Sequence, residues 1–511
     1  MQDVAAIDEV RHIEEVPSVG LFNNIARGII HANVSVNGTQ YQGDGEIICV
    51  NDTGFDKGST TNVHPAFAGR VLKLVALGRQ NKSDDPAGHG THVCGSVLGD
   101  GHSGSMGGAI QGTAPKAKLI VQSLLDATGN LGGIPADLHD LFKPPYDDNK
   151  VRIQTNSWGA TQPGLPYSQS SREIDDFIWN HQDCVICFSA GNSGVDANGH
   201  GVIDPGSLGS EAAAKNCITV RASENLRANM GLTYGQLNSS TFPRNPIFGD
   251  STTNHEEGMA AFSSRGPTKE GRFKPDVVAP GTSILSTRSR DLVNPPTIFG
   301  TSSDPAFFFD DGTSMATPLV AGCVAVLRET LVKNGTPNPP AALIKALLIN
   351  GAVELPGQYH PSEAGLSPNN SSGWGRVDLA GSVIIPGPNS KAGFGLGGPL
   401  RQGEESTITV NIPGQAGAGG VNAQGLPTLK ITLVWTDPPG ALLQNDLDLI
   451  VKAADGKERH GNMGTGDGFD RRNNVEQVVW TNIPPGDAKI IIRAFHVTQF
   501  PQPFAYAWRL S

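Results

Sequence analysis

Short, uninterrupted apolar runs recur along most of the chain and are separated by segments with helical periodicity. The runs lie at residues 46–50, 119–121, 184–188, 217–220 and 277–279. Continuous rather than alternating apolar residues are typical of strands that are buried on both faces of a parallel sheet. Alternation of such strands with helices predicts an α/β fold with a central parallel sheet flanked by helices. Within the helical segment at 170–179, Ser170 and Glu173 predict a capping box.

The pattern changes after residue 385. Residues 386–400 (PGPNSKAGFGLGGPL) are rich in glycine and proline and predict a linker. Beyond it, apolar residues recur at every second position: Leu429, Ile431, Leu433 and Trp435, then Phe504, Tyr506, Trp508 and Leu510. Period two with turn signals between the runs predicts a second, all-β domain at 386–511, an antiparallel sandwich or barrel.

Composition excludes some classes of function. The 38 basic and 49 acidic residues give a formal net charge of -11, which repels polyanions and makes nucleic acid an unsuitable partner. No segment is expected to span a membrane. The six cysteines lie mostly in apolar runs and are expected to be buried free thiols, although the sequence leaves one disulfide open.

Three separate segments carry side chains that fit one chemistry. Asp52 follows the strand at 46–50, His89 lies in the glycine-flanked GHGTH segment, and Ser314 lies in GTSMATP before a long helical run. Taken singly, a turn carboxylate, a turn histidine and a helix N-cap serine are the commoner interpretations. Together they supply a nucleophile, a base and a group that orients the base, in one of the known chain orders of a catalytic triad.

A fourth segment, Ser189-Ala190-Gly191-Asn192, follows the strand at 184–188. A tetrahedral intermediate needs hydrogen-bond donors aimed at its oxyanion, and the Asn192 amide and the Ser314 backbone N–H are the candidates. An ordinary turn at a strand end is the alternative. His92, one helical turn after His89, is interpreted as structural because no third metal ligand accompanies it.

These motifs resemble the subtilisin-like serine proteases, or subtilases. Asn156-Ser157-Trp158-Gly159, FSSRGP from Phe262 and KPDVVAPGTSILS from Lys274 extend the resemblance. It implies a subtilisin-like α/β domain that hydrolyses peptide bonds through an acyl-enzyme without a catalytic cofactor. It also implies that protein or peptide substrates bind in extended form. The substrate-binding residues would be Ser157, Trp158, Gly159, Ser189, Ala190 and Gly191.

The C-terminal segments QNDLDL, from Gln444, and RNNVE, from Arg472, resemble subtilases that carry a jelly-roll β-barrel and bind calcium. Asp446 and Asp448 are two residues apart on an expected strand, so their carboxylates would share one side and could hold a calcium ion. A solvated edge strand protected by its charges is the alternative.

The N-terminal segment around Glu9–Val16 resembles the last strand of an inhibitory propeptide. The resemblance implies a propeptide remnant at 1–22, a peptidase domain at 23–385, and self-cleavage near Phe22 and Asn23. The sequence contains no signal peptide and looks N-terminally incomplete, so an extracellular location is expected from the resemblance only. A monomer is expected. The alternative function is a catalytically silent subtilase scaffold, or a carbohydrate- or protein-binding module.

Overall fold

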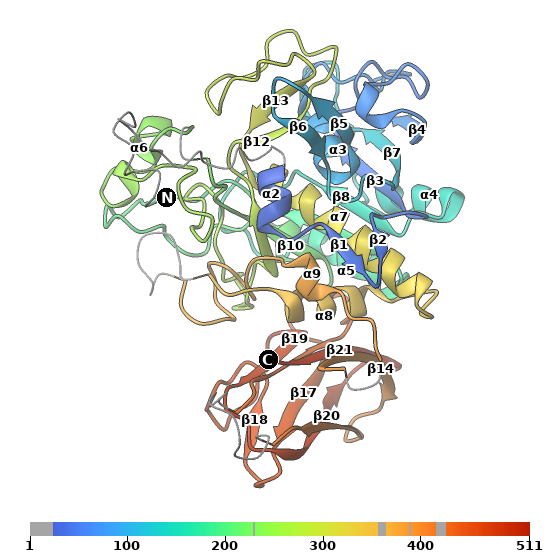
Figure 1. Ribbon diagram of the computed structural model, residues 1–511, viewed down its shortest axis with the longest axis vertical. Coiled ribbons are helices and arrows are strands. Elements are labelled where there is room, and N and C mark those ends of the chain that lie inside the picture. Colours follow the sequence, from blue (N-terminus) through green and yellow to red (C-terminus); the bar gives the residue numbers. More distant parts are fainter. Residues whose placement is uncertain (1–23, 228–229, 356–363, 388–389, 415–425) are drawn as a thin grey trace, which may run out of the picture.

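The computed structural model describes residues 24–227, 230–355, 364–387, 390–414 and 426–511. At its centre is a seven-stranded sheet in which every pair of neighbours is parallel (Figure 1). In sheet order the strands are β11 (Val277–Pro280), β10 (Ile218–Ser223), β9 (Val185–Ser189), β8 (Ile153–Asn156), β3 (Ile47–Asp52), β7 (Lys118–Ser123) and β4 (Val71–Ala76). All five apolar runs predicted as strands lie in this sheet, so the α/β prediction is confirmed.

Helices cover both faces of the sheet. Side chains alternate along β3, and Asp52 faces α3 (His89–Leu98), which packs beside the long helix α7 (Thr313–Lys333). Asn51 points the other way. It accepts a hydrogen bond from Gln122, which also donates to the Leu141 carbonyl of α4 (His139–Asn149). The candidate residues Asp52, His89 and Ser314 therefore lie on the face of the sheet that α3 and α7 cover.

Helix α5 (Gln169–Asn180) lies against α4, with the Phe142 and Phe177 rings 5.5 Å apart. Its capping box is formed by Ser168 and Ser171, and not by the predicted Ser170 and Glu173. The serine side chains of residues 168, 170 and 171 can all cap a helix, and only the backbone turn selects between them. The predicted capping pair is therefore wrong by two residues.

Helix α7 is long and apolar enough to cross a membrane by length and composition alone, contrary to the expectation that no segment would be. Its most apolar window is 94% buried within the protein. Gly322 allows its close packing, since a Cβ there would lie 2.5 Å from the Cβ of Thr113. Burial on all sides identifies α7 as the central helix of the core.

Smaller elements surround this core. They are α2 (Asn24–Ile29), β1 (Val34–Val36), β2 (Thr39–Tyr41), η1 (Pro65–Phe67), β5 (Asp100–Ser103), β6 (Gly108–Gln111), η2 (Glu211–Ala213), α6 (Tyr234–Leu237), η3 (Ile247–Gly249), β12 (Ile284–Thr287), β13 (Phe307–Asp310), α8 (Ala341–Gly351) and α9 (Leu379–Ser382). All six cysteines are buried and free, as expected.

The C-terminal strands form two four-stranded antiparallel sheets around a second apolar core, which confirms the predicted sandwich. One sheet has the order β14 (Ala392–Leu400), β21 (Gln502–Leu510), β16 (Leu429–Val434) and β19 (Val475–Trp480). The other has the order β15 (Glu405–Ile412), β20 (Gly486–Val497), β17 (Asn445–Lys452) and β18 (Glu458–His460).

Strand β14 occupies most of the segment predicted as a linker, so that prediction is wrong for residues 392–400. Its glycines pair with the aromatic residues of β21: Gly393 with Trp508, Gly395 with Tyr506 and Gly397 with Phe504. A Cβ at any of the three would come within 2.2–2.7 Å of a ring atom of its partner. The rings therefore cover the glycine backbone and take the place of side chains on β14.

The sandwich packs directly on the α/β part of the chain. Figure 1 shows its strands below α8 and α9. Val434, Ala505 and Ala507, from β16 and β21, belong to the same apolar core as α8. Asn350 at the end of α8 donates to the Ala507 carbonyl at 3.0 Å. Apolar packing and hydrogen bonds thus hold the two parts together.

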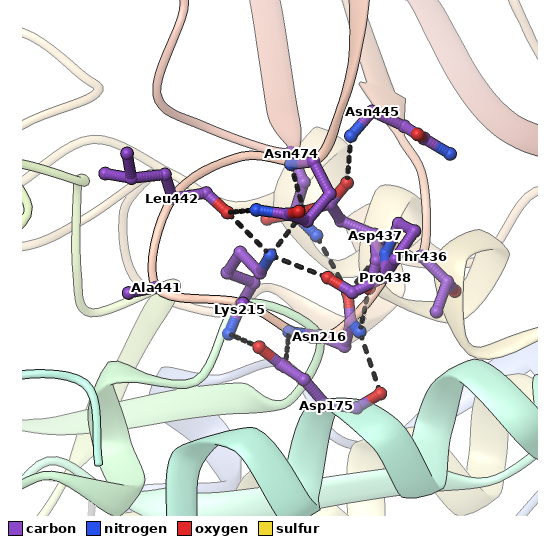
Figure 2. A network of polar contacts seen from close by, with 12 residues as sticks. Asp175, Lys215, Asn216, Thr436, Asp437, Pro438, Ala441, Leu442, Asn445 and Asn474 are labelled. Carbon is purple, nitrogen blue, oxygen red and sulfur yellow. Dashed lines mark hydrogen bonds and ion pairs between the residues drawn. The ribbon is translucent and has the colours of Figure 1, made fainter. Parts of the chain in front are cut away.

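A buried ion pair reinforces this junction (Figure 2). The ammonium of Lys215, which follows η2, binds the carboxylate of Asp437 and donates to the Pro438 carbonyl at 2.8 Å. Both side chains are fully buried. Asn216 donates to the Asp437 carbonyl and accepts from the Asp437 N–H, each at 2.8 Å. The loop after η2 is consequently fixed by the sandwich.

Candidate active site

Asp52 and His89 lie in contact at the carboxyl end of the central sheet. Asp52 is the last residue of β3 and His89 the first of α3. His89 Nδ1 lies 2.7 Å from Asp52 Oδ1, and Asp52 is 2% exposed. Gly88 adopts a φ of 81°, a left-handed conformation that favours glycine and turns the chain into α3. The carboxylate therefore holds one ring nitrogen and leaves the other for proton transfer.

The electrostatic surroundings of His89 favour its charged form. Burial is the largest single effect and lowers the pKa of His89, but the charge and the hydrogen bond of Asp52, together with the charges of Asp310 and Asp85, outweigh it and raise the pKa to about 9. An imidazolium is the species that forms when a histidine takes a proton from a serine hydroxyl. The site is thus arranged to stabilise the charge that general-base catalysis creates.

Asp85 holds the segments of Asp52 and His89 together, and the sequence reasoning missed it. Its Oδ1 accepts from the Thr53 hydroxyl at 2.8 Å and from the Gly88 N–H at 2.9 Å. Its Oδ2 accepts from the N–H and the hydroxyl of Thr91, at 2.8 and 2.7 Å. Burial raises the pKa of Asp85, while these four donors favour its ionised form. Asp85 is fully buried, and that burial is what marks it as important. Burial cannot be read from the sequence, so the sequence offered no signal for this residue.

Ser314 lies in the first turn of α7, where free backbone N–H groups favour negative charge. Gly312, just before the helix, has a φ of 148°. The Ser314 hydroxyl donates to the Ser157 carbonyl at 3.0 Å, and the Ser157 hydroxyl donates to the Ser314 carbonyl at 3.0 Å. Ser157 follows β8, whose Asn156 is paired with Asn51 of β3. The serine and the Asp52–His89 pair therefore meet at one end of the sheet.

In this state the Ser314 hydroxyl donates a hydrogen bond to the Ser157 carbonyl oxygen. Rotation about its side-chain bond is needed to turn it toward His89. Hydrogen bonds of a catalytic site commonly tighten only when substrate is bound. The resting geometry is consistent with a base and a nucleophile placed on the N-terminal ends of two packed helices.

Asn192 is held by the residue that precedes Ser314. Its Oδ1 accepts from the Thr313 N–H at 2.9 Å and from the Thr313 hydroxyl at 3.0 Å. The amide nitrogen Nδ2 lies 3.4 Å from the position of a Cβ on Gly312. With its oxygen occupied, Asn192 presents its amide N–H groups on the Ser314 side, where an oxyanion would form.

The expected substrate-binding residues lie along two neighbouring strand ends. Trp158 Nε1 donates to the Asn51 carbonyl at 3.0 Å, and the Ser189 hydroxyl reaches the Trp158 carbonyl at 3.4 Å. The Ala190 N–H is bonded to the Val220 carbonyl. Gly191 has a φ of 101°, and a Cβ there would lie 2.9 Å from the Ser264 hydroxyl. Gly159 follows Trp158, two residues after Ser157, whose carbonyl accepts from the Ser314 hydroxyl.

The structure also tests the histidine interpreted as structural. His92 is fully buried, its Nε2 lies 3.0 Å from the Ile284 carbonyl, and its ring packs on Phe308. Burial lowers the pKa of His92 to about 3, so the ring is neutral. Across the described ranges, three or more His, Cys, Asp and Glu side chains nowhere gather in an arrangement that could hold a metal.

Asp446 and Asp448 do not fit a calcium site. Their carboxylates face one side of β17, as expected, but Arg471 binds both of them. Arg493 also binds Asp448, at 2.7 Å. Two guanidinium groups supply the positive charge that a calcium ion would bring. These arginines are distant in sequence from the two carboxylates, so the pairing could not be predicted from the sequence.

Comparison with known proteins found relatives that are serine proteases. Residues 43–375 match the subtilase family. The serine protease/ABC transporter B family protein tagD of Dictyostelium discoideum is 29% identical over 91% of this chain and 32% of its own length. Serine protease AprX of Bacillus subtilis (strain 168) is 28% identical over 63% of this chain and 69% of its own. A solved structure of an S41 psychrophilic protease covers 69% of this chain and 97% of its own, at 24% identity and a TM-score of 0.47.

The chain spans about a third of the length of the Dictyostelium relatives, which it matches over 91–92% of its own length. The family match covers the whole of the central sheet, from before β3 to beyond β11, and includes Asp52, His89, Asn192 and Ser314. The chain belongs to the subtilase family.

Proposed function

We propose that the protein is a serine endopeptidase that hydrolyses peptide bonds in protein or peptide substrates. The observation that carries the proposal is the 2.7 Å contact between His89 Nδ1 and Asp52 Oδ1, at the sheet end where Ser314 and Asn192 also lie. Ser314 is the nucleophile, His89 the general base, Asp52 the orienting carboxylate and Asn192 an oxyanion donor. The proposed mechanism uses no cofactor.

The chemistry follows from these positions. The Ser314 oxygen attacks the carbonyl carbon of the substrate while its proton passes to the free ring nitrogen of His89. The substrate oxygen becomes an oxyanion that accepts from the Asn192 amide and the Ser314 N–H. His89 then returns the proton to the leaving amine, and an ester on Ser314 remains. Water, activated in turn by His89, hydrolyses this ester and releases the second product.

Labelling with phenylmethylsulfonyl fluoride tests the proposal. We expect a covalent adduct on Ser314, found by peptide mass spectrometry, together with loss of peptidase activity. The Ser314→Ala variant should take up no label and cleave no peptide. Absence of an adduct on Ser314 in the folded protein would favour the silent scaffold or binding module instead.

We further propose that the enzyme is processed from a proenzyme by its own activity, with an inhibitory propeptide as an internal partner. The resemblance of 1–22 to a propeptide end supports this, and these residues lie outside the described part of the chain. Amino-terminal sequencing of purified active protein should show a new terminus near Phe22 and Asn23. An intact Met1 in fully active protein would contradict self-cleavage there. Extracellular location and a monomeric state remain proposals that rest on the family resemblance.

A further inference from the structure

A pocket lies beside the strand edge that is proposed to bind substrate. It has a volume of about 310 Å³, within the range of small ligand sites. Its apolar wall comes mainly from Leu131, Ile134 and Leu138, in the segment that leads into α4, and from the face of Trp158. Gly159 and Ala160 form the adjoining edge. The pocket is therefore placed to receive a substrate side chain next to the extended backbone.

One charged residue, Glu211 at the start of η2, is among the residues that line this pocket. Its Oε2 accepts from the Ala160 N–H at 2.9 Å and from the Ser210 hydroxyl at 3.1 Å. The same oxygen lies 3.4 Å from the position that a Cβ on Gly159 would take. The absence of a side chain at Gly159 thus leaves the carboxylate close to the substrate edge.

This carboxylate is buried without a cation. Glu211 is 9% exposed, and no Lys, Arg or His within the described ranges forms an ion pair with it. Two basic residues close to η2 are paired with other carboxylates, Lys215 with Asp437 and Arg272 with Glu270. Both hydrogen bonds go to Oε2, and Oε1 is not among the fully buried atoms of the described residues, so this oxygen remains available to a cation that enters the pocket.

We propose that this pocket selects substrates with a lysine or arginine side chain, and that Glu211 determines this preference. The inference rests on the proposed peptidase function and names the substrate class of that site. The aliphatic stem of Lys or Arg would lie along Leu131, Ile134 and Trp158, and its cationic end would reach Glu211. The net charge of -11 favours encounter with such substrates.

A peptide series tests the inference. Each of the four residues on the acyl side of the scissile bond is varied in turn among lysine, acetyl-lysine and norleucine, and kcat/KM is measured for each peptide. Acetyl-lysine removes the charge while keeping the stem, so it tests the pocket without altering the protein. At one position we expect lysine to exceed acetyl-lysine and norleucine by about tenfold, the effect of a single well-formed ion pair.

Glu211→Gln is the matching variant, because its amide oxygen can still accept from the Ala160 N–H. The ratio of lysine to norleucine should fall to near one. Glu458→Gln, which removes the same unit of charge from the exposed strand β18, should leave the ratio unchanged. A wild-type enzyme without lysine preference at any of the four positions, or a preference that persists in Glu211→Gln, would overturn the inference.

Failure of the proposed function gives a different result. In that case the wild-type protein cleaves no peptide faster than the Ser314→Ala variant does. The inference is then measured as binding, by calorimetry with the Ser314→Ala protein and the same lysine and norleucine peptides. Equal affinities would overturn it, and tighter binding of the lysine peptide that is lost in Glu211→Gln would support it.

Discussion

Asp52 binds His89 through one oxygen only. Oδ1 lies 2.7 Å from the His89 Nδ1 and also accepts from the Thr53 N–H, while Oδ2 is buried with no hydrogen-bond partner among the described residues. An incompletely neutralised carboxylate interacts strongly with a nearby positive charge. This accounts for the raised pKa of the imidazole, and it has a direct consequence for the pH dependence of the enzyme.

We predict that kcat/KM rises with pH and levels off only in the alkaline range. The base must be unprotonated to act, and the pKa of His89 is about 9, so the active fraction increases tenfold per pH unit below that value. A pH profile measured with one peptide checks this. Asp310→Asn, which removes a contributing negative charge, should move the inflection to lower pH. An inflection near the ordinary histidine value in the wild type would contradict the prediction.

Asn192→Asp is expected to lower kcat with little effect on KM. Aspartate keeps an oxygen that accepts from Thr313 but replaces the amide donor by a carboxylate that repels the oxyanion. The loss should be at least about 10²–10³, the factor known from an oxyanion asparagine of subtilisin itself, a member of this family. Steady-state kinetics and a thermal unfolding curve separate catalysis from stability. A kcat within tenfold of the wild type would exclude Asn192 from this role.

Asp85→Asn should impair both stability and activity. The substitution replaces one carboxylate oxygen by an N–H₂ group. If Oδ1 is replaced, the new group faces the donors of Thr53 and Gly88, and if Oδ2 is replaced, it faces the donors of Thr91. Loss of these bonds to a buried charged group should cost about 2–3 kcal/mol of unfolding free energy. Because the charge of Asp85 also helps to raise the pKa of His89, the reduced kcat should be accompanied by a shift of the inflection to lower pH. An unchanged denaturation midpoint would contradict the structural role.

Oxidation of Met315 is expected to inactivate the enzyme. Met315 follows the nucleophile, is fully buried, and its sulfur lies 3.6 Å from the Cβ position of Gly312. A sulfoxide there places a polar oxygen beside the oxyanion site. Peroxide inactivation should follow Met315 oxidation measured by mass spectrometry, and Met315→Leu should resist it. Full activity of protein in which Met315 is oxidised would exclude this effect.

Lys215→Met should destabilise the whole chain. It leaves the Asp437 carboxylate buried at the junction without its cation, although the Gln444 and Asn445 N–H groups still donate to it. Loss of one partner of a buried pair costs about 3–5 kcal/mol. Urea unfolding followed by fluorescence measures the change, with Lys452→Met, whose ammonium pairs with Glu458 on the surface, as the control. Equal stability of the two variants would show that the junction contributes little.

The sequence predicted the elements whose signal is local. Buried strands such as β9 and β10 are continuous apolar runs, and the triad segments combine a strand end, a glycine-flanked histidine and a helix start. These features depend on residues close to one another in the chain, so their order and type could be predicted without coordinates.

Features that depend on distant partners could not be predicted. The glycines of β14 form a strand because the rings of β21, more than a hundred residues later, cover them. Asp446 and Asp448 resemble metal ligands until Arg471 and Arg493 are placed beside them. Glu211 has no motif, since its position in a pocket follows from how η2 is folded against Ala160.

The ladder of glycines and rings in β14 and β21 also has a mechanical consequence. It joins β14, the first strand of the sandwich, to the last strand β21 through backbone pairing and through the rings of Trp508, Tyr506 and Phe504. The same strand β21 rests on α8. A pulling force on β21 would therefore be transmitted directly to α8, so the sandwich and the α/β part should resist tension together.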